Sequence, residues 1–346
     1  MLAGLALWLL TRALLSGELG ALWAGWQSYA AVGLVVVNLL LGRFVRTSLA
    51  DAARYLTPRP ANVEARNAIR NDGVTLLRKL HSSGEFDRVV IVGHSLGSVI
   101  GYDIVRYVWD EMRHPQPPFS AGQHAARMLD ETGVALGSRP GPEEVAGFQE
   151  LQHRLWRENR SIGVPWLVTD LITLGAPLAH ADLLLTERGV TVDRRKQERE
   201  LPTCPPAVDD RTGSSSYVEE HPSATGTTGV LVGHHGAPFG PTRWTNLYFP
   251  VTLLILGDLV GGPLAPVFGA GVRDVPVRPP GTGWDRLRRR LFPFSHSAYW
   301  RSPARATPPL RRAEDDRRTG TREAAVALRA ALALDSVPRD ERRPRP

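Results

Sequence analysis

Three residues in this chain have the types and the order needed for acyl transfer through a serine nucleophile. Ser95 lies in the run GHSLG, from Gly93 to Gly97, which has the pattern Gly-X-Ser-X-Gly. A serine hydroxyl becomes an effective nucleophile when an imidazole takes its proton and a carboxylate fixes the tautomer of that imidazole. We expect Asp258 to be the carboxylate and His296 to be the imidazole, since each follows a strand-like segment.

Other acids and histidines were weighed against this choice. Asp182, which follows the strand that ends at the GAPLA segment, and Asp274 are the rival acids. His94 is adjacent to the nucleophile on a sharp turn, so we expect its ring to face away from it. His234 and His235 precede the expected acid in the chain, and adjacent histidines on an extended chain point in opposite directions, which makes a poor metal pair.

The residues around the serine indicate how it is presented. Arg88 to Val92 is apolar and β-branched over the length of a strand, as in a strand buried in a parallel sheet. Ser98 to Trp109 has the character of a helix that packs back on that sheet. The two glycines leave room for a tight turn between them, in which the serine is strained and the amide of Leu96 can donate to an oxyanion.

This strand, turn and helix around GHSLG resemble the nucleophile elbow of the α/β-hydrolase superfamily, most closely that of lipases and esterases. The resemblance runs from about Val63 to Trp300. It implies a mostly parallel sheet flanked by helices, the chain order serine, acid, histidine, and an acyl-enzyme formed from an ester or thioester. It also implies that the GAPLA segment after Leu174 helps to wall the active site.

Further elements follow from apolar periodicity. We predict two more helices, the first packing on the sheet and the second acting either as a cap or as a sheet-flanking helix. The strand set is completed by three segments, the second of which ends by presenting Asp258. Irregular insertions are expected near 113–160 and 187–241. The predicted helices are Val63–His81 and Glu143–Asn159, and the strands are Trp166–Leu174, Trp244–Leu256 and Gly271–Val277.

The N-terminal residues 1–42 are expected to form one or two transmembrane helices. Leu2–Leu15 and Gly20–Gly42 are apolar runs, and the second is long enough to span a bilayer. Arginines follow its end from Arg43 onward, which favours a cytoplasmic location for the domain expected over residues 43–300. A membrane-attached enzyme of this kind fits a lipid-like acyl substrate, with membrane lipid as its partner.

Composition narrows the possible function classes. The formal net charge is +7, but residues 301–346 hold twelve arginines and seven acidic residues, so most of the excess lies in that tail. The tail is expected to be largely disordered apart from a helical segment at Thr321–Leu334. Nucleic-acid binding is not indicated. Cys204 is the only cysteine, and no metal or other cofactor is expected.

One expected part is missing from the sequence. Enzymes of this type complete the oxyanion hole with an amide from a loop after an earlier strand, often marked by His-Gly, whereas only helix and linker character lies between Arg43 and the elbow. We therefore expect the biological chain to begin upstream of Met1, and the 346-residue chain to be a weak or inactive enzyme with an exposed sheet edge. The alternative is an inactive hydrolase-like membrane scaffold.

Overall fold

The computed structural model describes residues 62–117, 119, 122–185, 191–223, 226–252, 256–281, 283–291, 294–300 and 321–332, with isolated positions between 29 and 60. The chain divides into two units, Met1–Asp51 and Ala52–Pro346. In the first unit, residues 31–36 are helical. The second unit contains the sheet and every expected site residue, so the fold is described there.

A five-stranded sheet with the order β1-β2-β5-β6-β7 forms the centre of this unit, and each neighbouring pair is parallel. Strand β2 is buried at all seven positions, as expected for a strand covered on both faces. Each of the four expected strands corresponds to a strand of this sheet, although β5 ends at Tyr248 and not at Leu256, and β7 is an addition that the sequence did not reveal. The strands are β1 Val89–His94, β2 Val168–Leu174, β5 Arg243–Tyr248, β6 Arg273–Arg278 and β7 Arg322–Glu323.

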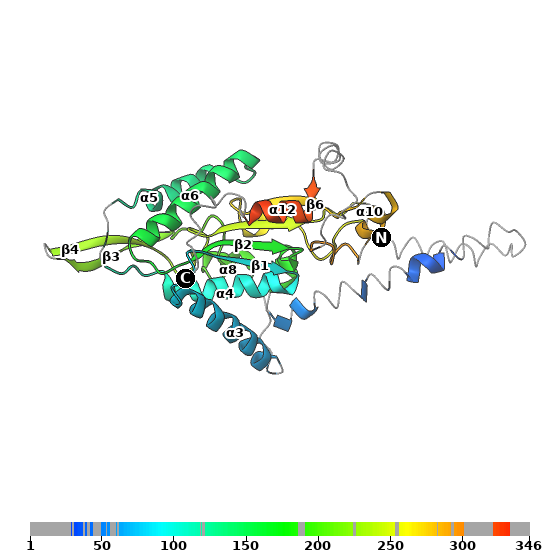
Figure 1. Cartoon of the computed structure of the whole chain (residues 1–346), viewed down its shortest axis with the longest axis horizontal. Coiled ribbons are helices and arrows are strands. Elements are labelled where there is room, and N and C mark those ends of the chain that lie inside the picture. The colour runs from blue at the N-terminus through cyan, green and yellow to red at the C-terminus, as the bar shows by residue number, and fades with distance from the viewer. Residues whose placement is uncertain are drawn as a thin grey trace, which may run out of the picture. The chain divides into compact units, whose positions relative to one another are not determined.

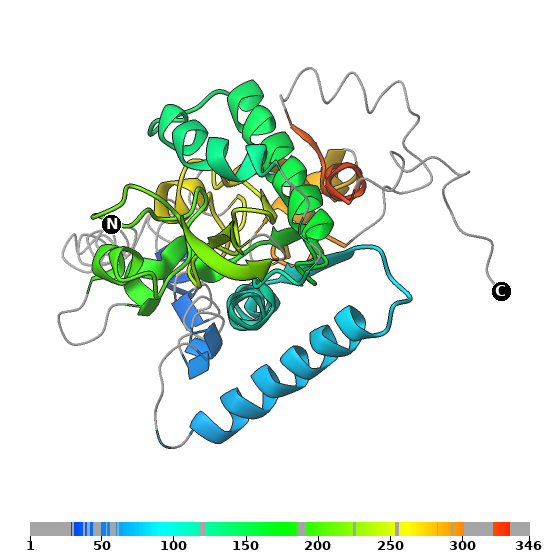
Figure 2. The ribbon, with the colours of Figure 1, turned by 90° about the vertical axis from the view of Figure 1, so that its left-hand side faces the viewer.

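Helices α4, Leu96–Met112, and α3, Val63–Ser82, lie on one side of this sheet (Figures 1 and 2). Helix α4 packs on β1 and β2, whereas α3 packs chiefly on α4 rather than on the sheet as predicted. A Cβ on Gly73 would lie 2.2 Å from Ile104 of α4, so the glycine allows this close approach. The buried Asp103 adds ion pairs at 2.9 Å with Arg70 of α3 and with Arg106.

Helices α6, Pro142–Ser161, and α12, Ala324–Ala331, cover the opposite face (Figure 1). Gln149 of α6 donates to the carbonyl of Trp244 in β5, so α6 is a sheet-flanking helix and not a cap. The apolar residues of α12 pack with those of β2, β5 and β6 in one buried cluster. Strand β7, with two residues, is the last strand on the side of the sheet opposite β1, and α12 follows it directly in the chain.

The two segments expected to be irregular insertions contain regular structure. The first holds α5, His124–Ala135, besides α6, and the second holds α8, Val192–Gln197, and an antiparallel hairpin of β3, Ser216–Ser223, and β4, Gly226–Gly233. The amide of Leu231 in this hairpin donates to Gln123 Oε1 at 2.7 Å, which connects the hairpin to the start of α5. Short elements complete the unit: η1 Pro177–His180, α7 Ala181–Leu185, α9 Ala265–Phe268 and α10 Gly283–Arg290.

The predicted membrane segments mostly fall outside the described residues. All of Leu2–Leu15 does so, and Gly20–Gly42 is described only at scattered positions. Among the residues that are described, none belongs to a helix with both the length and the apolar character that a bilayer crossing requires. The coarse assignment of the sequence, a mostly parallel α/β sheet flanked by helices, is confirmed.

Candidate active site

The turn between β1 and α4 presents Ser95 in a conformation that side chains rarely adopt. Its φ is 53° and its ψ is −126°, which is strained for a residue other than glycine. A Cβ on Gly93 would lie 2.5 Å from the carbonyl oxygen of Gly97, so the strand and helix backbones meet there and only glycine fits. A Cβ on Gly97 would meet nothing within 4 Å. The expectation that both glycines are required for space is therefore wrong for Gly97.

His296 joins the serine to the expected acid. Its Nε2 lies 2.8 Å from Ser95 Oγ, and its Nδ1 lies 2.9 Å from Asp258 Oδ2 and 3.0 Å from Oδ1. Because a carboxylate only accepts, Nδ1 carries the proton and Nε2 is left to accept from the serine hydroxyl. The structure thus brings together the three residues selected from the sequence, although they are 38 to 201 positions apart.

Asp258 is fully buried and its carboxylate is well supplied with donors. The Val260 amide donates to Oδ1 and the Tyr299 hydroxyl donates to Oδ2, both at 2.9 Å, in addition to His296. Burial acts to raise the pKa of Asp258, but the hydrogen bond and charge of His296, with the two other donors, hold that pKa below its usual value. Asp258 is therefore ionised at neutral pH and able to orient the imidazole.

Tyr299 was not selected from the sequence, yet it holds the acid in place. Its hydroxyl accepts from the Phe249 amide at 3.1 Å while it donates to Asp258, and its ring is fully buried against that of Phe249. Burial, and next the charge of Asp258, raise the pKa of Tyr299 well above its ordinary value, so the hydroxyl keeps its proton. The only sequence signal for it was its position three residues after His296.

Gly175 also contributes, at the start of the GAPLA segment. It has a φ of +54°, and a Cβ there would lie 2.7 Å from Asp258 Oδ2 and 2.8 Å from the Tyr299 ring. A Cβ on Gly261 would likewise lie 2.5 Å from Gly175 Cα. The carboxylate of Asp258 therefore occupies space that two missing side chains leave open. The resemblance implies that the GAPLA segment lines the active site, and in the structure Gly175 of this segment lies next to Asp258.

His94 contacts the base rather than the nucleophile. Its Nε2 donates to the carbonyl of His296 at 2.7 Å, and the two rings lie 4.9 Å apart. Burial lowers the pKa of His94, which favours the neutral ring with one nitrogen protonated. His94 is thus a positioning residue for the loop that carries His296, a role that sequence reasoning missed.

The rival residues lie elsewhere in the fold. Asp274 accepts from the amides of Leu264 and Ala265 and from Asn246, so it caps the short helix α9. Asp182 is exposed on α7. The carbonyl of His234 accepts from Trp109, and within the part of the chain that the structure describes no three His, Cys, Asp or Glu side chains form a metal-binding group.

The expected oxyanion donor, Leu96, is the first residue of α4. Amides in the first turn of a helix have no partner within the helix, and the helix dipole places partial positive charge at this end. An oxygen that becomes negative beside Ser95 would be stabilised there. Among the described residues no strand precedes β1, so none supplies a second amide from such a loop.

Comparison with known proteins adds no assignment. No protein-family model matches the chain, and neither a curated protein nor a solved structure is similar to it. The functional conclusion consequently depends on the geometry of the three residues and on the chemistry that it permits.

Proposed function

We propose that this protein is a serine hydrolase that cleaves an ester or thioester through an acyl-enzyme on Ser95. The observation that carries the proposal is one imidazole, that of His296, hydrogen-bonded at once to a strained serine and to the buried Asp258. Chance rarely produces a nucleophile, a base and an orienting acid within hydrogen-bond distance of one another. The parallel sheet and the order serine, acid, histidine support membership of the α/β-hydrolase superfamily.

The contacts define a role for each residue in acyl transfer. Ser95 Oγ attacks the carbonyl carbon while His296 Nε2 takes its proton, and Asp258 stabilises the imidazolium that forms. The tetrahedral oxyanion is stabilised by the Leu96 amide at the start of α4. His296 then returns the proton to the leaving alcohol or thiol, which departs and leaves the acyl group on Ser95. Water, deprotonated by His296, attacks the acyl carbon, and His296 then returns the proton to Ser95 Oγ as the carboxylic acid leaves.

Membrane attachment belongs to the same proposal and is supported by the sequence alone. The apolar runs before Gly42 would tether the chain, and the arginines that follow would keep the hydrolase domain in the cytoplasm. A lipid-like acyl substrate suits an enzyme held at a bilayer. Protease protection in sealed cells or spheroplasts tests the orientation, and digestion of the hydrolase domain from outside would contradict it.

The alternative function is an inactive hydrolase-like membrane scaffold. One observation favours it: the nucleophile follows the outermost strand, β1, and the described residues offer a single amide donor in the oxyanion position. A scaffold would keep the fold but would not accelerate hydrolysis. The two functions therefore differ in whether Ser95 reacts with an electrophile at a rate above that of an ordinary serine.

Labelling with a fluorophosphonate probe tests the proposal. The wild-type chain should be labelled, and Ser95→Ala and His296→Ala should both fail to label although their circular dichroism spectra match the wild type. His296→Ala is the sharper comparison, since it keeps the serine and removes only its base. Labelling that persists in Ser95→Ala would move the nucleophile elsewhere, and a wild type that resists the probe while a known esterase reacts would favour the scaffold.

A further inference from the structure

Helix α10, Gly283–Arg290, has the composition of a helix that lies on a charged surface. Its sequence GWDRLRRR holds four arginines and one aspartate, and none of its eight residues, all of them described, is buried. Trp284 is 84% exposed, and Leu287, one turn later on the same face, is also exposed. An apolar face with aromatic and aliphatic side chains, flanked by arginines, is typical of helices bound in the interfacial layer of a membrane.

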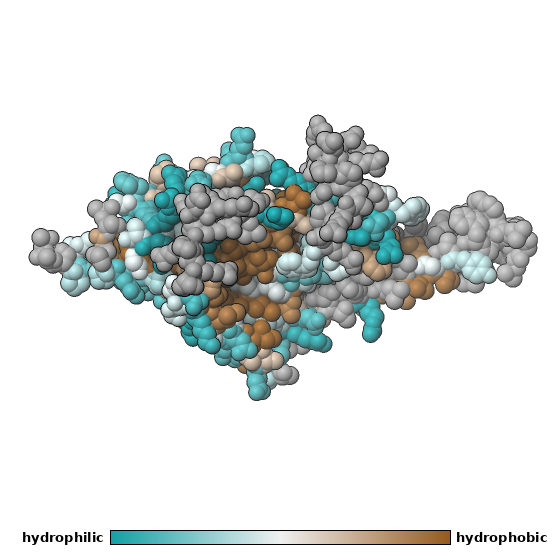
Figure 3. Space-filling view, in the orientation of Figure 1, coloured by the Kyte–Doolittle hydropathy of each residue, from teal (hydrophilic) through white to brown (hydrophobic). Residues whose placement is uncertain are grey.

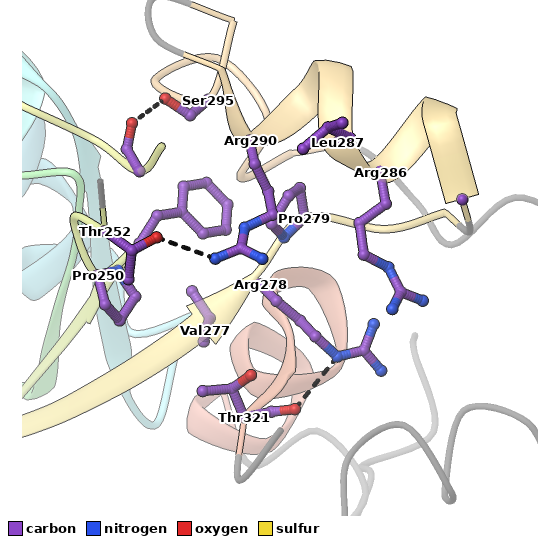
Figure 4. A pocket seen from close by; sticks show the side chains of 13 residues that line it. Pro250, Thr252, Val277, Arg278, Pro279, Arg286, Leu287, Arg290, Ser295 and Thr321 are labelled. Carbon is purple, nitrogen blue, oxygen red and sulfur yellow. Dashed lines mark hydrogen bonds between the residues drawn. The ribbon is translucent and has the colours of Figure 1, made fainter. Parts of the chain in front are cut away.

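A cavity lies against the adjoining face of this helix, and Leu287 belongs to its lining. Its volume is about 560 Å³, and it is bounded by α10, the ends of β5 and β6, and Thr321. In Figure 4 the side chain of Arg286 extends from α10 toward that of Arg278 at the end of β6, and the guanidinium of Arg290 is turned toward Thr252. Three guanidinium groups around one cavity favour an anion with several oxygen acceptors, such as a phosphate group.

The three arginines are held in place by neighbouring residues. Arg278 is paired with the buried Glu323 at 3.3 Å. Arg286 donates to the carbonyl of Gly281, and Arg290 donates to the Thr252 hydroxyl at 3.2 Å. Helix α10 itself carries four arginines and one aspartate, so its formal charge is positive and an anion would be attracted to it.

This surface is directly connected to the catalytic loops. The amide of Gly257, beside Asp258, donates to the carbonyl of Arg290 at 2.8 Å, and the amide of Ser295, beside His296, donates to Leu291 at 3.1 Å. The Ser295 hydroxyl in turn donates to the Gly257 carbonyl at 2.5 Å. Whatever binds α10 is thus held next to the loops that carry the acid and the base.

Exposed apolar side chains also flank His296 in the chain. Phe294 is 60% exposed and Trp300 is 53% exposed, and these residues stand on either side of His296. The ring of Trp300 lies 6.0 Å from that of His94, so this tryptophan is close to the turn that carries Ser95. Large exposed aromatic side chains next to a cationic cavity match a bilayer, which offers apolar chains and phosphate groups within one layer.

We propose that α10 and its cavity bind the surface of an anionic phospholipid bilayer. Trp284 and Leu287 enter the interfacial layer, while Arg286 and Arg290 bind the phosphate of one lipid headgroup. Bound in this way, the protein holds the loops of Asp258 and His296 against the bilayer. The proposal goes beyond hydrolysis and does not require it, so it is tested in full-length Ser95→Ala protein, where binding is read separately from catalysis.

Co-sedimentation with vesicles is the first test. The measured quantity is the affinity for vesicles with about 30% phosphatidylglycerol divided by the affinity for neutral phosphatidylcholine vesicles. Binding to the neutral vesicles measures every contribution that does not depend on lipid charge, including that of the N-terminal apolar runs. Arg286→Gln with Arg290→Gln should lower this ratio roughly tenfold or more. Arg154→Gln with Arg157→Gln, the same charge change on α6, should leave it within about twofold.

Two further comparisons separate the cavity from diffuse attraction. Arg290→Gln should lower the ratio more than Arg288→Gln, since both change the charge of α10 by one but only Arg290 lines the cavity. Vesicles of brominated phosphatidylglycerol should quench tryptophan fluorescence more in the Ser95→Ala protein than in its Trp284→Phe derivative. Equal effects of the two arginine variants, or quenching unchanged by Trp284→Phe, would overturn the proposal.

Free inorganic phosphate is the other ligand that could bind the arginines of this cavity. Binding of inorganic phosphate is measured by calorimetry on the same proteins. If phosphate binds and the Arg286 and Arg290 changes abolish that binding while vesicles show no preference for anionic lipid, the cavity is a site for a soluble anion and the bilayer proposal fails. A preference for anionic vesicles that is lost in the same variant supports it.

Discussion

The acid–base half of the candidate site and its nucleophile half have different supports. Asp258 and His296 come from loops that follow β5 and β6, two strands with neighbours on both sides. Asp258 is fully buried, and Tyr299, Val260 and His296 all donate to it. Each carboxylate oxygen of Asp258 therefore has more than one hydrogen-bond partner.

The nucleophile half lies at an edge. Ser95 follows β1, which pairs only with β2 among the described residues. Five of the six residues of β1 are half-buried, whereas every residue of β2 is buried. Figure 3 shows apolar side chains gathered near the centre of the drawn face, around the position of β1 and α4 in Figure 1.

This contrast shows which parts of the chemistry the fold enforces. In the proposed mechanism, protons pass through buried hydrogen bonds that cannot rearrange without leaving a charge or an amide unsatisfied. The position of Ser95 depends instead on one strand pairing and on the close approach of Gly93 to Gly97. Substitutions in the acid–base half should therefore change the catalytic rate, whereas substitutions along the edge strand β1 should change the self-association of the protein.

Ser95→Ala and His296→Ala should have the largest effect. Because acyl transfer needs the nucleophile and the base together, each change should reduce kcat for an activated ester on the order of 10⁶-fold, with the thermal unfolding midpoint nearly unchanged. The double variant should be no slower than either single variant, since the two residues act as one unit. Residual activity of Ser95→Ala within tenfold of the wild type would remove the serine from the mechanism.

Asp258→Asn should follow, with a loss of roughly 10⁴-fold in kcat, because an amide at this position favours the wrong imidazole tautomer. Asp274→Asn is the matched control: it removes a half-buried carboxylate that caps α9, so it should lower stability and leave the chemical step intact. Full activity of Asp258→Asn would shift the acid to Asp182 or Asp274.

Tyr299→Phe should have an intermediate effect. The change removes a donor to Asp258 and leaves the Phe249 amide without its acceptor, so it should cost about 1–3 kcal/mol of stability and lower kcat roughly tenfold. Tyr248→Phe, on β5, serves as the control, since its hydroxyl makes no hydrogen bond to any described residue. Denaturant unfolding and kcat measure the two effects, and equal losses in both variants would deny Tyr299 a positioning role.

The sequence predicted the positions of the site residues better than the elements between them. Gly-X-Ser-X-Gly after the apolar run at Val89–Val92 locates a turn because few other conformations accommodate it. The strand expected to present Asp258 ends at Tyr248, ten residues earlier, and residues 253–255 lie outside the described part. The acid was found from its order in the chain, not from the geometry of its loop.

Other features had weak local signals. The hairpin of β3 and β4 mixes Glu, Thr and Gly with few apolar residues, so its alternation is hard to detect. Strand β7 has two residues, and its pairing with β6 depends on tertiary contacts of Arg278 and Glu323. Tyr299 and His94 form hydrogen bonds with residues of other loops, namely Asp258, Phe249 and His296. Such contacts cannot be predicted before the fold has brought those loops together.

The open edge of β1 should cause weak self-association, the smallest of the expected effects. The Val89 and Ser95 amides donate toward β2, to Leu167 and Leu174. Because alternate residues of a strand direct their amides to the same side, those of Val90 and Val92 point away from β2. Unpaired amides along an apolar strand pair readily with another chain.

Proline at position 90 should block this pairing, because it removes an outward amide and leaves the bonds to β2 in place. Sedimentation velocity between about 1 and 100 µM should show concentration-dependent association in the wild type and less in Val90→Pro. Val89→Pro is the matched control: it removes the bond to Leu167, so it should lower stability by about 1 kcal/mol or more and leave association unchanged. A wild type that stays monomeric over this range would show that the edge of β1 does not pair with another chain. The two halves of the site would then differ only in how deeply their residues are buried.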